Sequence, residues 1–153
     1  MKRLIFPIFA AFLLVSCNAF YEDVVSVDKD GWTSDSIARF EFEITDTIPT
    51  YSIGIQVRNA PDYQFQNLWL FVKKVYPDMS FRNDTVQLML ADEYGNWIGS
   101  GIGSIYSATY PYEGSVHFRQ PGKYIWYIQH GMRTDSLPGI YSVGLKIVEN
   151  GEK

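Results

Sequence analysis

The chain has 153 residues, of which 46% are hydrophobic and 16% aromatic, and its formal net charge is −4 at pH 7. This length suits one domain, and the hydrophobic content excludes an intrinsically disordered chain. The acidic balance, with no basic stripe, disfavours nucleic acid as a partner.

Residues 1–16 have the features of a secretory signal peptide. Lys2 and Arg3 precede an apolar run that ends at Leu14-Val15-Ser16-Cys17. The run is shorter than the ~20 residues of a membrane-spanning helix, so we expect cleavage. The last four residues resemble the lipobox of bacterial lipoproteins, which implies a diacylglycerol on the sulfur of Cys17. The alternative is an ordinary secreted chain with a free cysteine; no second cysteine exists to form an intramolecular disulfide.

Cleavage would leave a mature chain of 137 residues. Without Lys2 and Arg3, 11 basic residues face 17 acidic ones, a net charge of about −6. The contact with the bilayer is therefore expected to come from acyl chains on Cys17 and not from charge. The predicted parts are a signal peptide at 1–16, a lipidated N-terminus and tether at 17–30, a β-sandwich domain at 31–149 and a C-terminal tail at 150–153.

The first strong strand pattern covers residues 38–44, where apolar and charged side chains alternate. Residues 51–57 alternate in the same way, and the turn residues 46–49 between the two runs predict that they pair as a hairpin. The continuous apolar run 68–72 predicts a strand that is covered on both faces. The run 84–90 then places its aliphatic residues on one face.

The second half of the chain shows the same pattern after a glycine-rich passage. Glycines alternate with other residues over 99–103, which suggests bulges or close backbone approach. Two later strands, around 124–130 and 143–147, each carry one apolar face. Seven or eight short strands with turn signals and no helical period predict an all-β protein, a single antiparallel β-sandwich in which jelly-roll-like connections are one option.

A search for catalytic, cofactor-binding and metal-binding groups finds none. Ser100 and Ser104 lack the flanking glycines of a nucleophile elbow. The strand parity of His130 predicts that it packs inside, whereas His117 has the parity of a solvent-facing residue, so the two histidines do not converge on a metal. Asp92-Glu93 fits a solvated turn better than a pair of catalytic carboxylates. We therefore expect a protein that is not an enzyme and needs no cofactor.

Four short segments repeat the order aspartate, hydroxyl residue, aliphatic residue. They resemble the O-glycosylation sequon of the Bacteroidetes periplasm, and this resemblance implies sugar on the hydroxyl residues. Asp-Ser and Asp-Thr also form turns readily just before strands, and that alternative explains the positions equally well. The candidate sites are Ser36, Thr47, Thr85 and Ser136.

Five aromatic residues around the glycine-rich passage raise a second function. Aromatic faces stack on sugar rings, so a glycan-binding module is the alternative to a protein that works by contact with other proteins. A place in the buried core is the commoner fate of such residues. An exposed aromatic platform would favour sugar, and a flat apolar patch would favour a protein partner. The five residues are Tyr94, Trp97, Tyr106, Tyr110 and Tyr112.

A series of short motifs is similar, in their order, to GldH, the gliding motility-associated lipoprotein family of Bacteroidetes. The resemblance implies a non-enzymatic accessory lipoprotein of a gliding apparatus associated with type IX secretion. It also implies other envelope lipoproteins or membrane proteins of that apparatus as partners, and anchoring in the cell envelope, with the outer membrane favoured over the inner. Whether the domain faces periplasm or medium stays open. The motifs include Gly31-Trp32, Phe40-Glu41-Phe42, Asn67-Leu68-Trp69-Leu70, Gly95-Asn96-Trp97, Met132-Arg133 and Leu137-Pro138-Gly139-Ile140.

Overall fold

The computed structural model describes residues 19–28, 30–101 and 103–151. Within this part, every regular element is a β-strand, and no helix is long and apolar enough to cross a membrane. The strands are β1 (Tyr21–Ser26), β2 (Trp32–Thr33), β3 (Ala38–Ile44), β4 (Thr50–Asn59), β5 (Asn67–Val75), β6 (Phe81–Met89), β7 (Ser100–Gly101), β8 (Tyr106–His117), β9 (Gly122–His130), β10 (Ser136–Leu137) and β11 (Ile140–Asn150).

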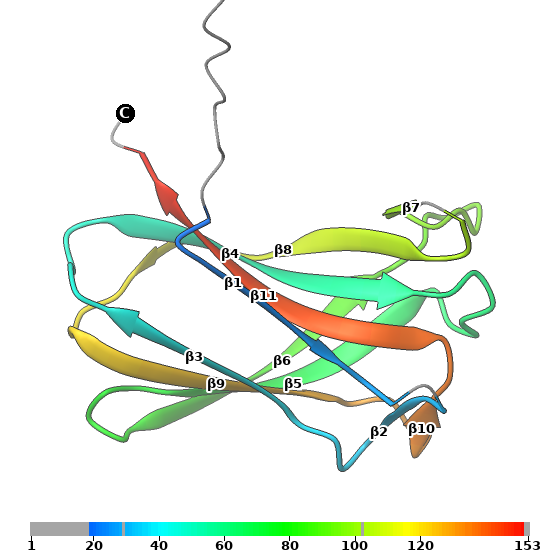
Figure 1. Cartoon of the computed structure of the whole chain (residues 1–153), viewed down its shortest axis with the longest axis horizontal. Coiled ribbons are helices and arrows are strands. Elements are labelled where there is room, and N and C mark those ends of the chain that lie inside the picture. Colours follow the sequence, from blue (N-terminus) through cyan, green and yellow to red (C-terminus); the bar gives the residue numbers. More distant parts are fainter. Residues whose placement is uncertain (1–18, 29, 102, 152–153) are drawn as a thin grey trace, which may run out of the picture.

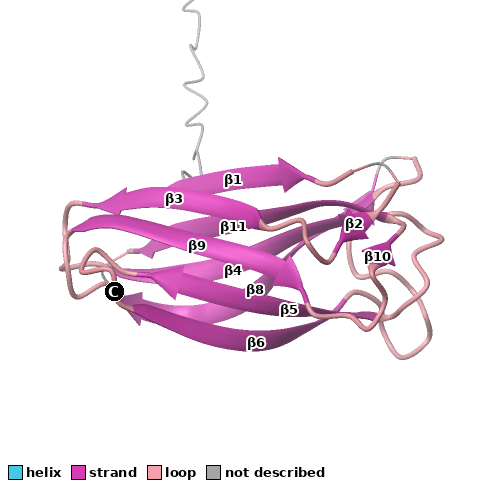
Figure 2. Cartoon of the chain, turned by 90° about the horizontal axis from the view of Figure 1, so that it is seen from below, coloured by secondary structure: helices cyan, strands magenta, loops and turns pink. Residues whose placement is uncertain are grey.

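Two antiparallel sheets pack face to face and form a β-sandwich (Figures 1 and 2). The five-stranded sheet has the order β1-β11-β4-β8-β7, and the four-stranded sheet has the order β3-β9-β5-β6. A small ribbon of β2 and β10 lies at one end of the sandwich (Figure 2). The all-β sandwich that the alternating sequence predicts is confirmed.

The core lies between the two sheets, where the inward apolar side chains of both sheets meet. Alternate residues of β3 and β9 are buried, as their sequence patterns predict, whereas β11, which lies between β1 and β4, is buried at four consecutive residues. Phe42 of β3 lies at the centre of an aromatic cluster, with ring centroids 5.6 Å from Tyr124, 5.8 Å from Trp126 and 5.7 Å from Phe118. Stacked contacts, as with Tyr124, and edge-to-face contacts, as with Trp126 and Phe118, add to the free energy that the burial of large rings supplies.

The predicted hairpin between residues 38–44 and 51–57 is wrong. These runs are β3 and β4, and they lie in different sheets: β3 pairs with β9, whereas β4 pairs with β11 and β8. The chain crosses from one sheet to the other in the turn after β3. Alternation shows which side chains of a strand face the core, but it is the same for a hairpin partner and for a strand of the opposite sheet.

The segment expected as a tether contains an ordered strand. β1 pairs with β11 over six residues, from Tyr21 opposite Ile147 to Ser26 opposite Ser142. Phe20, just before β1, packs against Tyr51 with a centroid distance of 5.1 Å. The sandwich therefore begins ten residues earlier than Gly31, because β11 needs a partner on the side away from β4.

The β2–β10 ribbon depends on a glycine at its start. Gly31 has φ of +121°, and a Cβ there would lie 2.5 Å from Oγ of Ser136 and 2.9 Å from the backbone nitrogen of Pro138. The close approach seats Trp32 in the core at 1% exposure, where its Nε1 donates to the carbonyl of Ser36 at 2.7 Å. Only glycine meets both the conformational and the steric requirement.

Candidate contact surfaces

The proposed lipid site and the signal peptide lie outside the described residues, since these begin at residue 19. The four candidate hydroxyls do fall within them, and the fold keeps them apart. Ser36 and Thr85 are exposed, in the loop before β3 and on β6. Thr47 and Ser136 are half-buried, and Ser136 packs against Gly31.

Turn geometry accounts for at least one of the four Asp-hydroxyl segments. The backbone N–H of Ile48 donates to Oδ1 of Asp46 at 2.9 Å, which closes a turn after β3. Asp84 has a different role, because its carboxylate pairs with a buried lysine. Asp92 was assigned to a solvated turn and lies in one: its Oδ1 accepts the N–H groups of Tyr94 and Asn96.

The two histidines lie where their strand parity predicts. His130 is 2% exposed and packs edge-on against Trp32, with ring centroids 5.5 Å apart, while His117 is exposed. Burial lowers the pKa of His130, so the ring is neutral at pH 7. In the described part of the chain, no three His, Cys, Asp or Glu side chains gather in a way that could hold a metal ion.

The five aromatic residues proposed as a sugar platform do not form one. Tyr94 is 81% exposed at a turn, whereas Tyr110 is 8% exposed and belongs to the core. Trp97 lies with its ring centroid 6.2 Å from that of Tyr106, and both are half-buried. The hydroxyl of Tyr112 donates to Oδ2 of Asp84 between the sheets at 2.7 Å. Most of these rings therefore contribute to packing.

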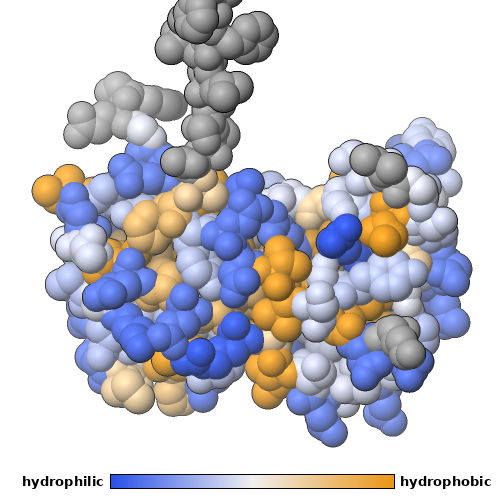
Figure 3. Space-filling model, in the orientation of Figure 1, coloured by the Kyte–Doolittle hydropathy of each residue, from blue (hydrophilic) through white to orange (hydrophobic). Residues whose placement is uncertain are grey.

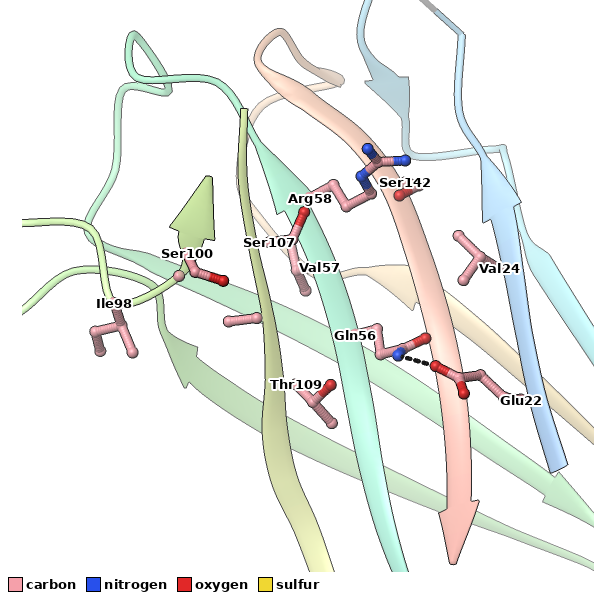
Figure 4. Close-up of a pocket in the computed structure, with 12 residues that line it drawn as sticks. Glu22, Val24, Gln56, Val57, Arg58, Ile98, Ser100, Ser107, Thr109 and Ser142 are labelled. Atoms are coloured by element: carbon pink, nitrogen blue, oxygen red, sulfur yellow. Dashed lines mark hydrogen bonds between the residues drawn. The ribbon is translucent and has the colours of Figure 1, made fainter. Parts of the chain in front are cut away.

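The outer face of the five-stranded sheet carries a shallow groove of about 580 Å³ (Figure 4). Its floor consists of small and polar side chains of β1, β4, β8 and β11, and Nε2 of Gln56 donates to Oε1 of Glu22 at 2.5 Å. Residues 98–100 close one end, where a Cβ on Gly99 would lie 2.8 Å from the carbonyl oxygen of Ser107, so the predicted close approach is confirmed. The molecular face drawn in Figure 3 mixes hydrophilic and hydrophobic side chains, with an apolar strip near its middle.

A buried lysine joins the two sheets at the side where β6 lies. Lys74 is 3% exposed; its Nζ lies 2.9 Å from Oδ2 of Asp84 on β6 and 2.5 Å from Oε1 of Glu113 on β8. The same ammonium group lies 4.5 Å from the ring centroid of Tyr112 and 4.9 Å from that of Trp126. These contacts compensate the desolvation of the charge.

The pKa of Asp84 shows which interaction dominates in this cluster. Burial raises the pKa of the carboxyl, and the hydrogen bonds from Lys74 and Tyr112 more than offset that effect, so the pKa lies below its usual value. Burial and the bond to Asp84 raise the pKa of Tyr112, which stays protonated as the donor. The cluster therefore links the two layers through one ammonium group that pairs with two carboxylates.

The outer face of the four-stranded sheet carries several exposed apolar side chains, along β5 and at the turn between β5 and β6. The predicted strand 68–72 was expected to be covered on both faces, and that prediction is wrong: Trp69 is 39% exposed and Phe71 is 49% exposed. Phe71 lines a hollow of about 760 Å³ together with Ile37, Met79 and Phe81. We call this surface the apolar face; its exposed members are Ile37, Trp69, Phe71, Met79 and Phe81.

The turn between β5 and β6 brings Met79 to one end of the apolar face. Met79 has φ of +67°, which no other described residue except glycine shares in sign, and its side chain is 77% exposed. A left-handed backbone costs free energy for a side chain of this size. Trp69 and Phe71 share a face because side chains alternate along a strand, and no strand of the described fold covers that face.

Comparison with known proteins identifies relatives along almost the whole chain. A profile of the GldH lipoprotein family matches residues 19–147. "Gliding motility lipoprotein GldH homolog" of Christiangramia forsetii is 31% identical over 92% of this chain and 91% of its own length. "Gliding motility lipoprotein GldH" of Flavobacterium johnsoniae is 29% identical over 90% and 91%.

One match among solved structures comes from a much larger protein. The VP2 subviral particle of infectious bursal disease virus matches 87% of this chain and 30% of the capsid chain, with a TM-score of 0.36 and 15% identity. This similarity is too low to support a conclusion about fold family or function. The extent of the family match and the 31% identity lead to one conclusion: the chain belongs to the GldH lipoprotein family.

Proposed function

We propose that this chain is a lipid-anchored, non-enzymatic accessory component of the gliding motility machinery, and that it works by contact with other envelope proteins. Membership of the GldH family and the names of the two relatives support the link to gliding. The lipobox at Cys17 supports the anchor. The partners are envelope lipoproteins or membrane proteins of the gliding apparatus and of the type IX secretion system associated with it.

The observation on which the contact proposal rests is the apolar face. Exposed Trp69, Phe71 and Phe81 lie together on one side of a rigid sheet, and side chains of this kind dominate the free energy of protein interfaces. The face carries a hollow of about 760 Å³, which suits an apolar side chain of a partner. The groove on the outer face of the five-stranded sheet is smaller, at about 580 Å³, and mixes polar side chains such as Gln56 with the apolar Val24 and Ile98.

A pair of matched substitutions tests this proposal in cells. Phe71→Glu removes an aromatic ring from the apolar face, and Tyr141→Glu removes one of similar exposure, 39%, from the five-stranded sheet. After crosslinking in cells and pull-down, we expect Phe71→Glu to lose specific envelope partners and Tyr141→Glu to retain them. Recovery of bulk lipoproteins alone, or equal loss with both variants, would contradict the proposal.

The anchor and the sugar sites are proposed on sequence, and one measurement tests both. The intact mass of protein purified from native membranes should show a chain that starts at Cys17 with acyl groups attached. Sugar would add further mass, and exposed Ser36 and Thr85 are the most accessible of the four positions. A bare thiol at residue 17 would remove the anchor, and a mass explained by lipid alone would remove the sugar. The Cys17→Ser chain serves as the unanchored reference.

A further inference from the structure

The two sheets have four free edges, and three of them are protected against pairing with another strand. β1 places Glu22 and Asp23 at its edge. β7 has only two residues, and the rest of that edge is β8, which contains Pro111 and pairs with β4 through two register shifts. β3 carries Arg39, Glu41 and Glu43 on its outer side. Charge and short length are the devices by which natural sheets avoid joining edge to edge.

The fourth edge, β6, has neither device on its outer side. It is nine residues long, contains no proline or glycine, and pairs with β5 from Phe81 to Met89 without a register shift. Figure 2 shows no strand beyond it. Every second residue of such a strand directs its N–H and C=O groups away from the neighbour, so β6 offers a straight row of donors and acceptors.

The outer side of β6 is symmetric in its chemistry. Read in either direction from Thr85, the outward side chains are hydroxyl, amide and apolar. An antiparallel copy centred on Thr85 therefore places each type opposite its own kind. The outward residues in order are Phe81, Asn83, Thr85, Gln87 and Met89.

From this symmetry we propose that β6 pairs antiparallel with β6 of a second copy of this chain, about a two-fold axis at Thr85, to join two four-stranded sheets into one of eight strands. Phe81 then faces Met89 of the second copy, and Asn83 faces Gln87. Cross-strand pairs of matched chemistry stabilise a sheet, and a two-fold contact closes after two copies. The pairing uses the edge of the sheet and leaves Trp69 and Phe71 exposed.

The inward side chains of β6 are compatible with this pairing because the charge of Asp84 is already neutralised within its own chain. Asp84 is held by Lys74 at 2.9 Å and by the hydroxyl of Tyr112 at 2.7 Å. In the proposed register it faces Val86 of the second copy and meets no opposing acid. Arg82, whose side chain is 70% exposed, faces Leu88, which is buried at 3% exposure, so no like charge opposes the guanidinium group there.

Single cysteines in the full-length chain test the register in native membranes. With a thiol-specific crosslinker of about 5 Å span, Thr85→Cys should yield covalent dimers, because directly opposite Cβ atoms lie roughly 5 Å apart. Asn83→Cys should not, because the two copies of residue 83 would lie roughly 13 Å apart, four residue rises along the strand. The double variant with Asn83→Cys and Gln87→Cys should crosslink again. The parent chain corrects for any reaction at Cys17.

Two outcomes would overturn the dimer: no crosslink at Thr85→Cys, or an equal yield from Thr85→Cys and Asn83→Cys. A second measurement uses charge at the axis. Thr85→Lys would place two ammonium groups face to face on an exposed surface, so the mass in detergent should fall from dimer to monomer, while Thr85→Ser retains the dimer. Sugar on Thr85 of every chain would also overturn the pairing, because a glycan at the axis would separate the strands. Loss of partners from Phe71→Glu would leave all these readouts unchanged.

Discussion

The two edges of the four-stranded sheet differ in where their charged side chains lie. At β3 the apolar residues face the core and the charged ones face water, where Glu41 pairs with Arg39 and, at 2.6 Å, with Lys123. At the β5–β6 edge most inward side chains are also apolar, but the charged Lys74 and Asp84 lie among them, and the aromatic ring of Phe71 lies outside. The β3 edge of this sheet therefore exposes charged side chains, and the β5–β6 edge exposes apolar side chains suited to contact with a partner. At the β5–β6 edge the inward charges of Lys74 and Asp84 neutralise each other, which is compatible with a stable fold.

Removal of the buried lysine should have the largest effect on this contrast. Lys74→Ala leaves two carboxylates without their cation and removes the contacts with Tyr112 and Trp126. Breaking a buried ion pair costs about 3–5 kcal/mol, and partial exposure of both carboxylates reduces this to about 2–3 kcal/mol. Chemical denaturation at neutral pH measures the free energy of unfolding. A loss well below 1 kcal/mol would show that the pair does not stabilise the sandwich.

Lowering the pH should have a smaller effect on stability than removing the lysine, and it should act through Asp84. The pKa of Asp84 is lowered in the folded state, so its contribution to the free energy of unfolding is present at neutral pH and is lost as pH falls through the ordinary carboxyl range towards the folded pKa. In Lys74→Ala the main cause of the lowered pKa is absent. The stability difference between the parent and Lys74→Ala should therefore shrink on going from pH 7 to pH 3. A difference that stays constant would contradict this assignment.

His130 does not disturb that comparison. Its lowered pKa makes the protein lose stability as pH falls through the ordinary histidine range, because the unfolded chain binds the proton first. This loss occurs equally in the parent and in Lys74→Ala, since His130 contacts Trp32 and not the lysine cluster. The difference between the two pH profiles removes it.

The smallest effect is expected at the β3 end. Lys123→Ala breaks the ion pair with Glu41, but the lysine side chain is 63% exposed and water solvates both partners. Exposed pairs contribute little to folding, so the unfolding curve should match that of an ordinary surface substitution. A loss equal to that of Lys74→Ala would show that the two ends do not differ as described.

Sequence reasoning succeeds where parity alone decides the outcome. The alternation in β3, the inward parity of His130 and the close approach at Gly99 all depend on local geometry, and all three are confirmed. Sequence reasoning fails where the outcome depends on which other part of the fold covers a strand. The run 68–72 is apolar on both parities, and the sequence does not show that only one side meets a second layer.

A local sequence pattern also could not predict which strands pair with each other. β1 appears irregular in sequence because only its pairing with β11, more than a hundred residues away, makes it a strand. The symmetry of β6 is visible in the sequence once its bounds are known. Its meaning depends on the fold, since the same residues in a central strand would have partners on both sides.

The pairing of β1 with β11, the first and last strands, determines how this domain would respond to a mechanical force. Tension on a lipid at Cys17 would enter the described fold through Phe20 and Tyr21. Hydrogen bonds in an antiparallel pair run across the strands, so a pull along β1 would load six residue pairs at once in shear, whereas a pull away from the sheet would open them one by one. Resistance to force would therefore depend on the direction of the pull.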